Sequence, residues 1–161
     1  MKIILLGTIV LLGIASYYDI KFRMIPNITS VGIIILGLLY NILNDSQNGL
    51  KISLLGMLIG FVFFVILYIF KMMGAGDVKL GAGAGSILGI KIIPAIVVIV
   101  LVGGLIAIIQ ITTFIINKRF FLNKLNNELK ERSLRKGVFK QNVPYGLAIS
   151  IGTILTLIIY Y

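Results

Sequence analysis

Carboxylates are the side chains in this sequence with the most potential for acid–base chemistry. The chain has no histidine and no cysteine, which excludes disulfides, Cys/His metal sites, cysteine nucleophiles and histidine general bases. The 5 acidic residues are Asp19, Asp45, Asp77, Glu128 and Glu131. Any catalysis by a carboxylate must therefore use these positions.

Asp19 and Asp77 differ from the other acids in their surroundings. Asp19 ends a long apolar run, and Asp77 follows Gly74-Ala75-Gly76 at the start of another. Ionisable residues at the edge of a membrane segment are costly and usually functional. The alternative for Asp77 is a structural role at a helix N-terminus, where the helix dipole favours an anion.

A pair of carboxylates at one membrane face predicts the chemistry of an aspartic protease. Two like charges in one site cannot both ionise cheaply, so the pair holds one proton near neutral pH. The ionised member can activate a water, and the protonated member can donate to the scissile carbonyl oxygen. We therefore expect Asp19 and Asp77 to be catalytic without a metal or cofactor, provided that the surrounding elements bring them to the same depth.

The composition is that of an integral membrane protein. Of 161 residues, 59% are hydrophobic and 12% are charged, and the mean hydropathy is +1.10. A water-soluble domain has roughly 45–50% apolar and about 25% charged residues. The net charge of +10 is spread thinly over an apolar chain, which makes a poor footprint for nucleic acid. We expect contact with the lipid bilayer and none with nucleic acid.

The long uncharged runs predict an all-α, polytopic membrane helix bundle in a single domain, 1–161. About 20 apolar residues cross a bilayer core of roughly 30 Å, and the backbone there must be helical. About six transmembrane helices are expected, near 2–19, 28–44, 52–70, 76–90, 92–116 and 143–160. A basic stretch, 117–142, separates the last two.

The positions of lysine and arginine predict the orientation. Cytoplasmic loops carry an excess of these residues. With both termini outside, all but three of the 15 basic residues fall in the inside segments 20–27, 71–79 and 117–142, and the three are Lys2, Lys51 and Lys91. Asp19 and Asp77 then both lie at the cytoplasmic face of the cell membrane.

Glycines recur at helical spacing in two of the expected spans. Gly81, Gly85 and Gly89 are four residues apart, and Gly56 and Gly60 repeat this spacing. Small residues four apart let membrane helices approach closely. The pattern predicts tight packing, and it is also compatible with a thin, central fourth helix that carries a functional group.

Three segments together resemble the type IV prepilin peptidases, a family of membrane aspartyl proteases. Gly74-Ala75-Gly76-Asp77-Val78-Lys79 is similar to the GxGD-x-K motif of this family. Asp19 followed by Ile25-Pro26-Asn27 resembles the first catalytic aspartate and its IPN segment. Pro144-Tyr145-Gly146 is similar to the PFGP signature, with Leu147 in place of the second proline.

The resemblance implies cleavage of a short basic leader from pilin-like precursors, before their hydrophobic segment and at the cytoplasmic face. It implies Asp19 and Asp77 as the catalytic residues, with a site shaped by Gly74, Gly76, Lys79, Pro26, Asn27, Pro144, Tyr145 and Gly146. Larger members of the family carry a cytoplasmic domain with paired CxxC motifs that is associated with N-methylation. Since this chain has no cysteine, it resembles the short, peptidase-only form, and we expect no methyltransferase activity.

Other interpretations of these residues stay open. Pro26 and Asn27 suit the start of a helix, where proline is well tolerated, and Lys79 could adjust the charge at Asp77 or extend to the membrane surface. Tyr145 suits an interfacial anchor. A small ion- or proton-coupled transporter could use Asp19 and Asp77 as a cation site, and an assembly scaffold would explain the glycines but not the aspartates.

Overall fold

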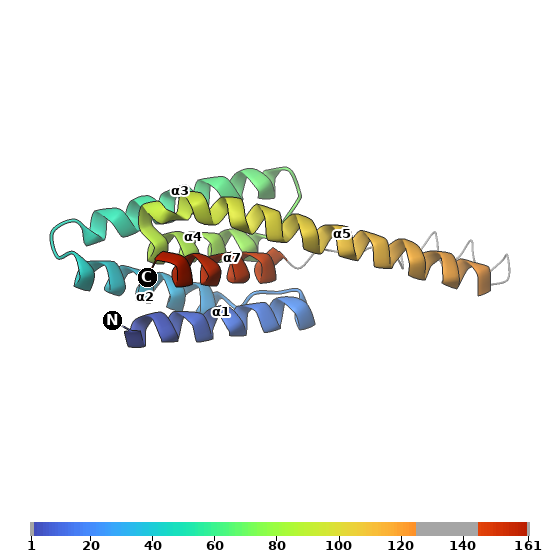
Figure 1. The fold of residues 1–161 in the computed structure, drawn as a ribbon, viewed down its shortest axis with the longest axis horizontal. Coiled ribbons are helices and arrows are strands. Elements are labelled where there is room, and N and C mark those ends of the chain that lie inside the picture. Colours follow the sequence, from blue (N-terminus) through green and yellow to red (C-terminus); the bar gives the residue numbers. More distant parts are fainter. Residues whose placement is uncertain (1, 125–144, 161) are drawn as a thin grey trace. The chain divides into compact units, whose positions relative to one another are not determined.

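The computed structural model describes residues 2–124 and 145–160, which form helices joined by short connections (Figure 1). The helices are α1 (Lys2–Phe22), α2 (Asn27–Asn44), α3 (Gly49–Ile69), α4 (Ala75–Leu88), the 3-10 helix η1 (Gly89–Lys91), α5 (Ile92–Lys124) and α7 (Tyr145–Tyr160). No β-strand occurs among these residues. The all-α fold class predicted from the sequence is confirmed for this part of the chain.

Four helical stretches in the described ranges are long and apolar enough to cross a membrane. They are Lys2–Phe22, Asn27–Asn44, Gly49–Ile69 and Ala75–Thr113, and the apolar helix Tyr145–Tyr160 is shorter. The last long stretch holds α4 and much of α5, between which the chain reverses direction at η1 (Figure 1). The protein has the helices of a membrane bundle, while six spans and outside termini stay predictions.

The chain divides into two compact units. The first contains Met1–Gly103 and Pro144–Tyr161, and the second contains Gly104–Val143. The first unit therefore holds α1 to α4, η1, the beginning of α5, and α7. The described part of the second unit is the rest of α5, which continues to Lys124, past the expected end near 116. The expected single domain stays a prediction, and 125–142 of the basic stretch lies outside the described residues.

The buried face of α1 explains why Asp19 points into the protein. The buried residues of this helix are Thr8, Leu12, Ala15 and Asp19. Their spacing of three and four residues places them on one helical stripe. Apolar residues on the other faces, such as Leu6 and Tyr17, are 66% and 55% exposed. Asp19 thus continues the packed stripe instead of facing the surroundings.

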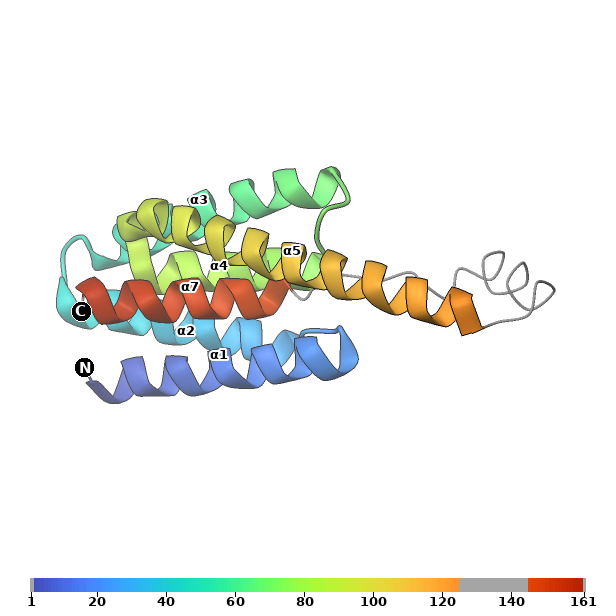
Figure 2. The ribbon, with the colours of Figure 1, turned by 45° about the vertical axis from the view of Figure 1, so that its right-hand side comes forward.

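α4 is the central helix of the first unit (Figures 1 and 2). All of its residues from Leu80 to Leu88 are buried. A methyl group added at Gly56 would clash with the backbone of Gly85 and Gly89, and one added at Gly60 would clash with Gly81. The glycines therefore allow α3 to pack against α4 with their backbones in contact, as their spacing predicts.

Side chains of neighbouring helices satisfy the carbonyl groups where α4 ends. Asn41 Nδ2 donates to the carbonyls of Ser86 and Ile87 over 2.8 and 3.2 Å, and Ser53 Oγ donates to Ser86 O over 2.6 Å. Gly89 follows with a φ of 56°, a left-handed conformation that glycine adopts easily. With 14 residues, α4 is only about 21 Å long, and these donors compensate for its early end.

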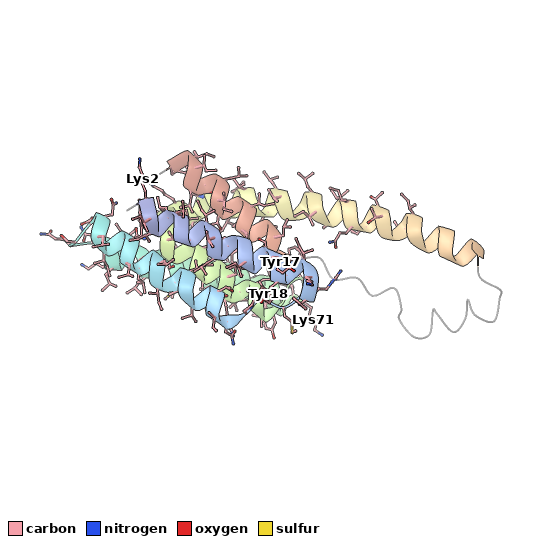
Figure 3. All side chains as sticks on the ribbon, turned by 90° about the horizontal axis from the view of Figure 1, so that it is seen from below. Lys2, Tyr17, Tyr18 and Lys71 are labelled. Carbon is pink, nitrogen blue, oxygen red and sulfur yellow. The ribbon has the colours of Figure 1, made fainter. Side chains whose placement is uncertain are left out.

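The helix directions bring three helix N-termini together. Contacts of Gly32 with Leu11 and of Gly7 with Leu36 make α1 and α2 antiparallel. The C-terminal end of α1 therefore meets the N-terminal ends of α2, α4 and α7 (Figures 1 and 2). We call this the aspartate end of the first unit. Figure 3 shows Tyr17, Tyr18 and Lys71 near this end and Lys2 at the opposite one.

Candidate active site

Asp19 is held at the aspartate end by the first turn of α7. Its side chain is 7% exposed, and Oδ2 accepts a hydrogen bond from the backbone N–H of Leu147 over 3.3 Å. Gly146 packs directly against the same oxygen, since a methyl group added to it would lie 2.8 Å from Oδ2. Since the N-terminal amides of a helix lack intrahelical partners, the start of α7 offers donors that a carboxylate can use.

Asp77 is positioned by the turn that begins α4. Its Oδ2 accepts a hydrogen bond from the Gly74 N–H over 2.9 Å, and its own N–H donates to Gly74 O over 3.1 Å. The Asp77 side chain thus caps the Gly74 N–H as the N3 residue of a capping box does, and the return bond runs to the backbone because Gly74 has no side chain. The other carboxylate oxygen, Oδ1, is buried and has no hydrogen-bond partner in the described part of the chain. The cap therefore fixes Asp77 while it leaves one oxygen available.

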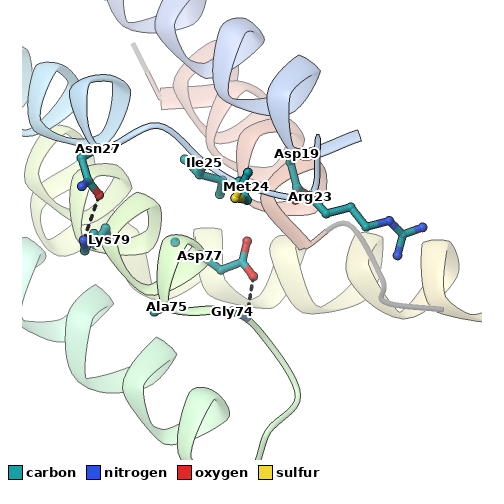
Figure 4. A pocket seen from close by; sticks show the side chains of 10 residues that line it. Asp19, Arg23, Met24, Ile25, Asn27, Gly74, Ala75, Asp77 and Lys79 are labelled. Carbon is teal, nitrogen blue, oxygen red and sulfur yellow. Dashed lines mark hydrogen bonds between the residues drawn. The ribbon is translucent and has the colours of Figure 1, made fainter. Parts of the chain in front are cut away.

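The two aspartates line one pocket of about 350 Å³ (Figure 4). The whole lining consists of Asp19, Arg23, Met24, Ile25, Asn27, Gly74, Ala75, Gly76, Asp77 and Lys79. The pocket thus combines two carboxylates, two cations and a stretch of backbone without large side chains, all within the first unit.

Lys79 lines the pocket, but its hydrogen bond goes to Asn27 and not to Asp77. Its Nζ donates to Asn27 Oδ1 over 2.9 Å (Figure 4). The bond joins α4 to the first residue of α2, whose first turn is further held by the Thr29 hydroxyl donating to Pro26 O over 2.7 Å. Asn27 and Lys79 therefore link the two helices next to the aspartates, and Pro26 precedes α2 as its N-cap.

The segment Pro144-Tyr145-Gly146, which the sequence also singled out, contributes to the site through the backbone of Gly146. A methyl group on Gly146 would lie 2.8 Å from Asp19 Oδ2, so only glycine leaves room for this carboxylate. Tyr145 is half-buried and lies near Gly103 of α5, outside the pocket lining. Pro144 lies outside the described residues.

The remaining acids are not part of this pocket. Asp45 caps the end of α2 at the opposite end of the unit, where its Oδ1 accepts hydrogen bonds from the N–H groups of Gln47 and Asn48. Glu128 and Glu131 lie outside the described residues. Within the ranges that the structure covers, no group of three or more potential metal ligands is found.

Sequence reasoning missed several residues of the site. Arg23, Met24 and Ile25 line the pocket, and Leu147 holds Asp19 through its amide. The connection Arg23-Met24-Ile25-Pro26 between α1 and α2 is short, which signals that it must pass close to Asp19. The contribution of Leu147 is made by backbone, so its side-chain type gives no signal.

The site can perform chemistry that needs two neighbouring carboxyl groups. Carboxylates that share a site share a proton, so one can accept a proton while the other donates one. The N-termini of α4 and α7, each of which directs amides at one aspartate, stabilise negative charge. Such a pair can activate water and protonate a leaving group without moving far.

A comparison with models of known protein families gives a match that covers most of the chain. The model described as the type IV leader peptidase family matches residues 6–109. The matched range includes both aspartates and ends before α7. No curated protein and no solved structure gives a significant match to the chain.

Proposed function

The chain belongs to the type IV leader peptidase family, and on this premise we propose that it is a membrane-embedded aspartyl endopeptidase whose catalytic pair is Asp19 and Asp77. The observation that carries the proposal is the shared pocket. Two buried carboxyl groups from helices far apart in sequence line it together. A buried like-charged pair is costly, and its presence is best explained by a reaction that uses it.

The geometry supports distinct roles for the atoms of the pair. Asp77 Oδ2 is occupied by the Gly74 amide, whereas Oδ1 has no partner in the described residues. Oδ1 is therefore the position at which the shared proton can face a substrate carbonyl oxygen. Asp19, held by the Leu147 amide in the first turn of α7, then takes the proton of the attacking water. The proton balance closes when the C–N bond breaks: Asp19 passes its proton to the leaving amine, and Asp77 takes its proton back from the hydroxyl of the intermediate as the carbonyl re-forms.

The glycine-rich turn supports an extended peptide as the substrate. Gly74, Ala75 and Gly76 form one wall of the pocket, and the small side chains there let a substrate backbone approach Asp77. We propose a pilin-like precursor as the protein substrate, cleaved between its short basic leader and its hydrophobic segment. The aspartate end then faces the cytoplasm, because the basic residues Lys21, Arg23, Lys71 and Lys79 lie there.

Peptidase activity alone is proposed, without methylation of the product. The chain has no cysteine, and only four residues, Arg23-Met24-Ile25-Pro26, connect α1 to α2. This connection holds no additional domain of the kind associated with N-methylation in the larger proteins that the sequence resembles.

The decisive experiment replaces each aspartate by asparagine. A pilin-like precursor is co-expressed with the wild type, Asp19→Asn, Asp77→Asn or the double variant, and leader loss is read as a gel shift. Asparagine keeps the size of the side chain but cannot exchange a proton, so each single variant should lose essentially all cleavage. The double variant should be no worse, since residues that act as one unit are non-additive.

Asp45→Asn is the matched control, because Asp45 lies at the opposite end of the unit. It should cleave like the wild type. If Asp77→Asn still cleaves near the wild-type rate while it is expressed and inserted normally, the aspartyl mechanism is wrong. A cation site in a transporter would then be the better explanation for the pair.

A further inference from the structure

Ile25 occupies an unusual position between the two halves of the site. It lies on the connection between α1 and α2 at the wall of the pocket (Figure 4). A methyl carbon on Gly76 would lie 3.2 Å from Ile25 Cβ, and one on Gly146 would lie 2.9 Å from Ile25 Cδ1. One side chain thus packs against the bare backbone of α4 through its inner carbons and of α7 through its terminal carbon.

Each of these glycines adjoins a group that fixes one aspartate. Gly76 directly precedes Asp77 in the capped first turn of α4. Gly146 directly precedes Leu147, whose N–H holds Asp19 Oδ2, and its own Cα faces the same carboxylate. The side chain of Ile25 therefore fills the space between the backbone that carries Asp77 and the backbone that holds Asp19.

The backbone around Ile25 is itself fixed on both sides. The Arg23 N–H donates to Asp19 O over 3.0 Å, and Arg23 has a φ of 53°, a left-handed conformation that non-glycine residues adopt only under constraint. On the other side, the N–H and hydroxyl of Thr29 both donate to Pro26 O. Ile25 is thus presented from a short, anchored segment and can act as a spacer of constant size.

We propose that Ile25 is a positioning residue that sets the separation of Asp19 and Asp77, a role that rests on the proposed peptidase function. The side chain carries no charge and makes no hydrogen bond, so it acts only through volume and shape. If its volume is reduced, α7 and the first turn of α4 can shift toward each other and carry the carboxyl groups with them. Misplacement of reacting groups by about 1 Å can lower a rate by roughly 100-fold.

The branched shape of isoleucine allows a graded test. Ile25→Val removes only the terminal carbon that packs on Gly146, and Ile25→Ala also removes the carbons beyond Cβ that pack on Gly76. We expect kcat for precursor cleavage to fall about tenfold in Ile25→Val and further in Ile25→Ala, with KM nearly unchanged. Ile25→Leu keeps the volume and should recover part of kcat.

Ile92→Val is the matched control. Ile92 is fully buried and follows η1 at the opposite end of the unit, so the substitution removes the same carbon far from the aspartates. It should lower the thermal unfolding temperature in detergent without changing kcat. Equal effects of Ile25→Val and Ile92→Val on kcat would show that Ile25 contributes only to stability, and the proposal would be wrong.

The pH dependence of kcat is a measurement that a change in stability alone does not alter. A shared proton gives a bell-shaped profile whose width reflects the coupling of the two carboxyl groups. The charged groups that line the pocket, Asp19, Asp77, Arg23 and Lys79, are unchanged in every Ile25 variant. A shorter separation strengthens the coupling of the two carboxyl groups, so the profile of Ile25→Ala should be broader than that of the wild type. An unchanged width in Ile25→Ala would argue against a change in separation.

Cross-linking tests the spacing without any cleavage. Because the chain has no native cysteine, the Asp19→Cys/Asp77→Cys variant carries thiols at these two positions only. Its yield with a short bifunctional maleimide should change when Ile25→Ala is added and should stay constant when Ile92→Val is added. If Ile25→Ala changes the cross-linking yield but the wild-type chain cleaves no precursor, the peptidase proposal is refuted and the spacer role of Ile25 is kept. An unchanged yield would refute the spacer role.

Discussion

The backbone N–H of Leu147 lies 3.3 Å from Oδ2 of Asp19, so the last described helix of the chain holds the carboxylate of the first. Gly146 makes this possible, because any larger residue would place a carbon against the same oxygen. The Asp77 carboxylate is held within its own turn by Gly74. One aspartate therefore depends on long-range packing and the other on local structure.

Gly146→Ala should impair the site through this contact. The added methyl group would lie 2.8 Å from Asp19 Oδ2 and 2.9 Å from Ile25 Cδ1, so the carboxylate must shift. We expect precursor cleavage to fall by about tenfold or more. Gly13→Ala, in the same helix as Asp19, adds a methyl group with nothing within 4 Å and should leave cleavage unchanged. Equal cleavage by the two variants would contradict the assigned contact.

Asn27 and Lys79 should behave as a coupled pair. Their hydrogen bond links α2 to α4 over 2.9 Å and is exposed, so a double-mutant cycle with alanine should give a coupling free energy on the order of 0.5 kcal/mol. The measurement is the free energy of unfolding in detergent for the two single variants and the double variant. Lys21→Ala is the control, since the Lys21 amine donates to Tyr17 within α1 and should show no coupling to Asn27. Additive effects of Asn27 and Lys79 would show that the bond contributes nothing.

The proposed topology predicts where tags are found. Tags inserted after Asn126 should report the cytoplasm, and tags at Ser46 or after Tyr161 should report the outside, because basic residues favour the inside. The structure supports a common side for the tags at Ser46 and after Tyr161. Lys91 donates to Tyr160 O, which places the end of α7 beside η1, and Asp45 ends α2 at this end of the first unit, opposite the aspartate end. A cytoplasmic C-terminus would place the aspartate end outside and refute the proposed face of cleavage.

The processed product should keep an unmethylated N-terminus. Purified protein, precursor and a methyl donor are incubated together, and the product is analysed by mass spectrometry. We expect a free amine, because the chain has no cysteine and only four residues connect α1 to α2. A product that carries one additional methyl group would overturn the peptidase-only proposal, while cleavage itself would be unaffected.

The sequence by itself predicted the helices and singled out Asp19 and Asp77 as candidate catalytic residues. Apolar runs can be recognised from the order of residues alone. Two of the described helices begin at Asn27 and Ala75, close to the predicted starts at 28 and 76. Glycine spacing predicted close helix packing, since residues four apart share a helical face, and the structure shows this packing between α3 and α4. The capping role open to Asp77 could also be predicted, because a cap joins residues within one turn.

Tertiary structure decided the contacts that turn these residues into a site. Hydropathy and spacing fix neither the rotation of one helix against another nor which helices meet, because these depend on packing across the bundle. Only the structure therefore showed Leu147 bonded to Asp19, Lys79 bonded to Asn27 and Ile25 between two glycines. Backbone amides and apolar spacers leave no distinctive residue type in a sequence, so the groups that position the aspartates emerge only when the chain is folded.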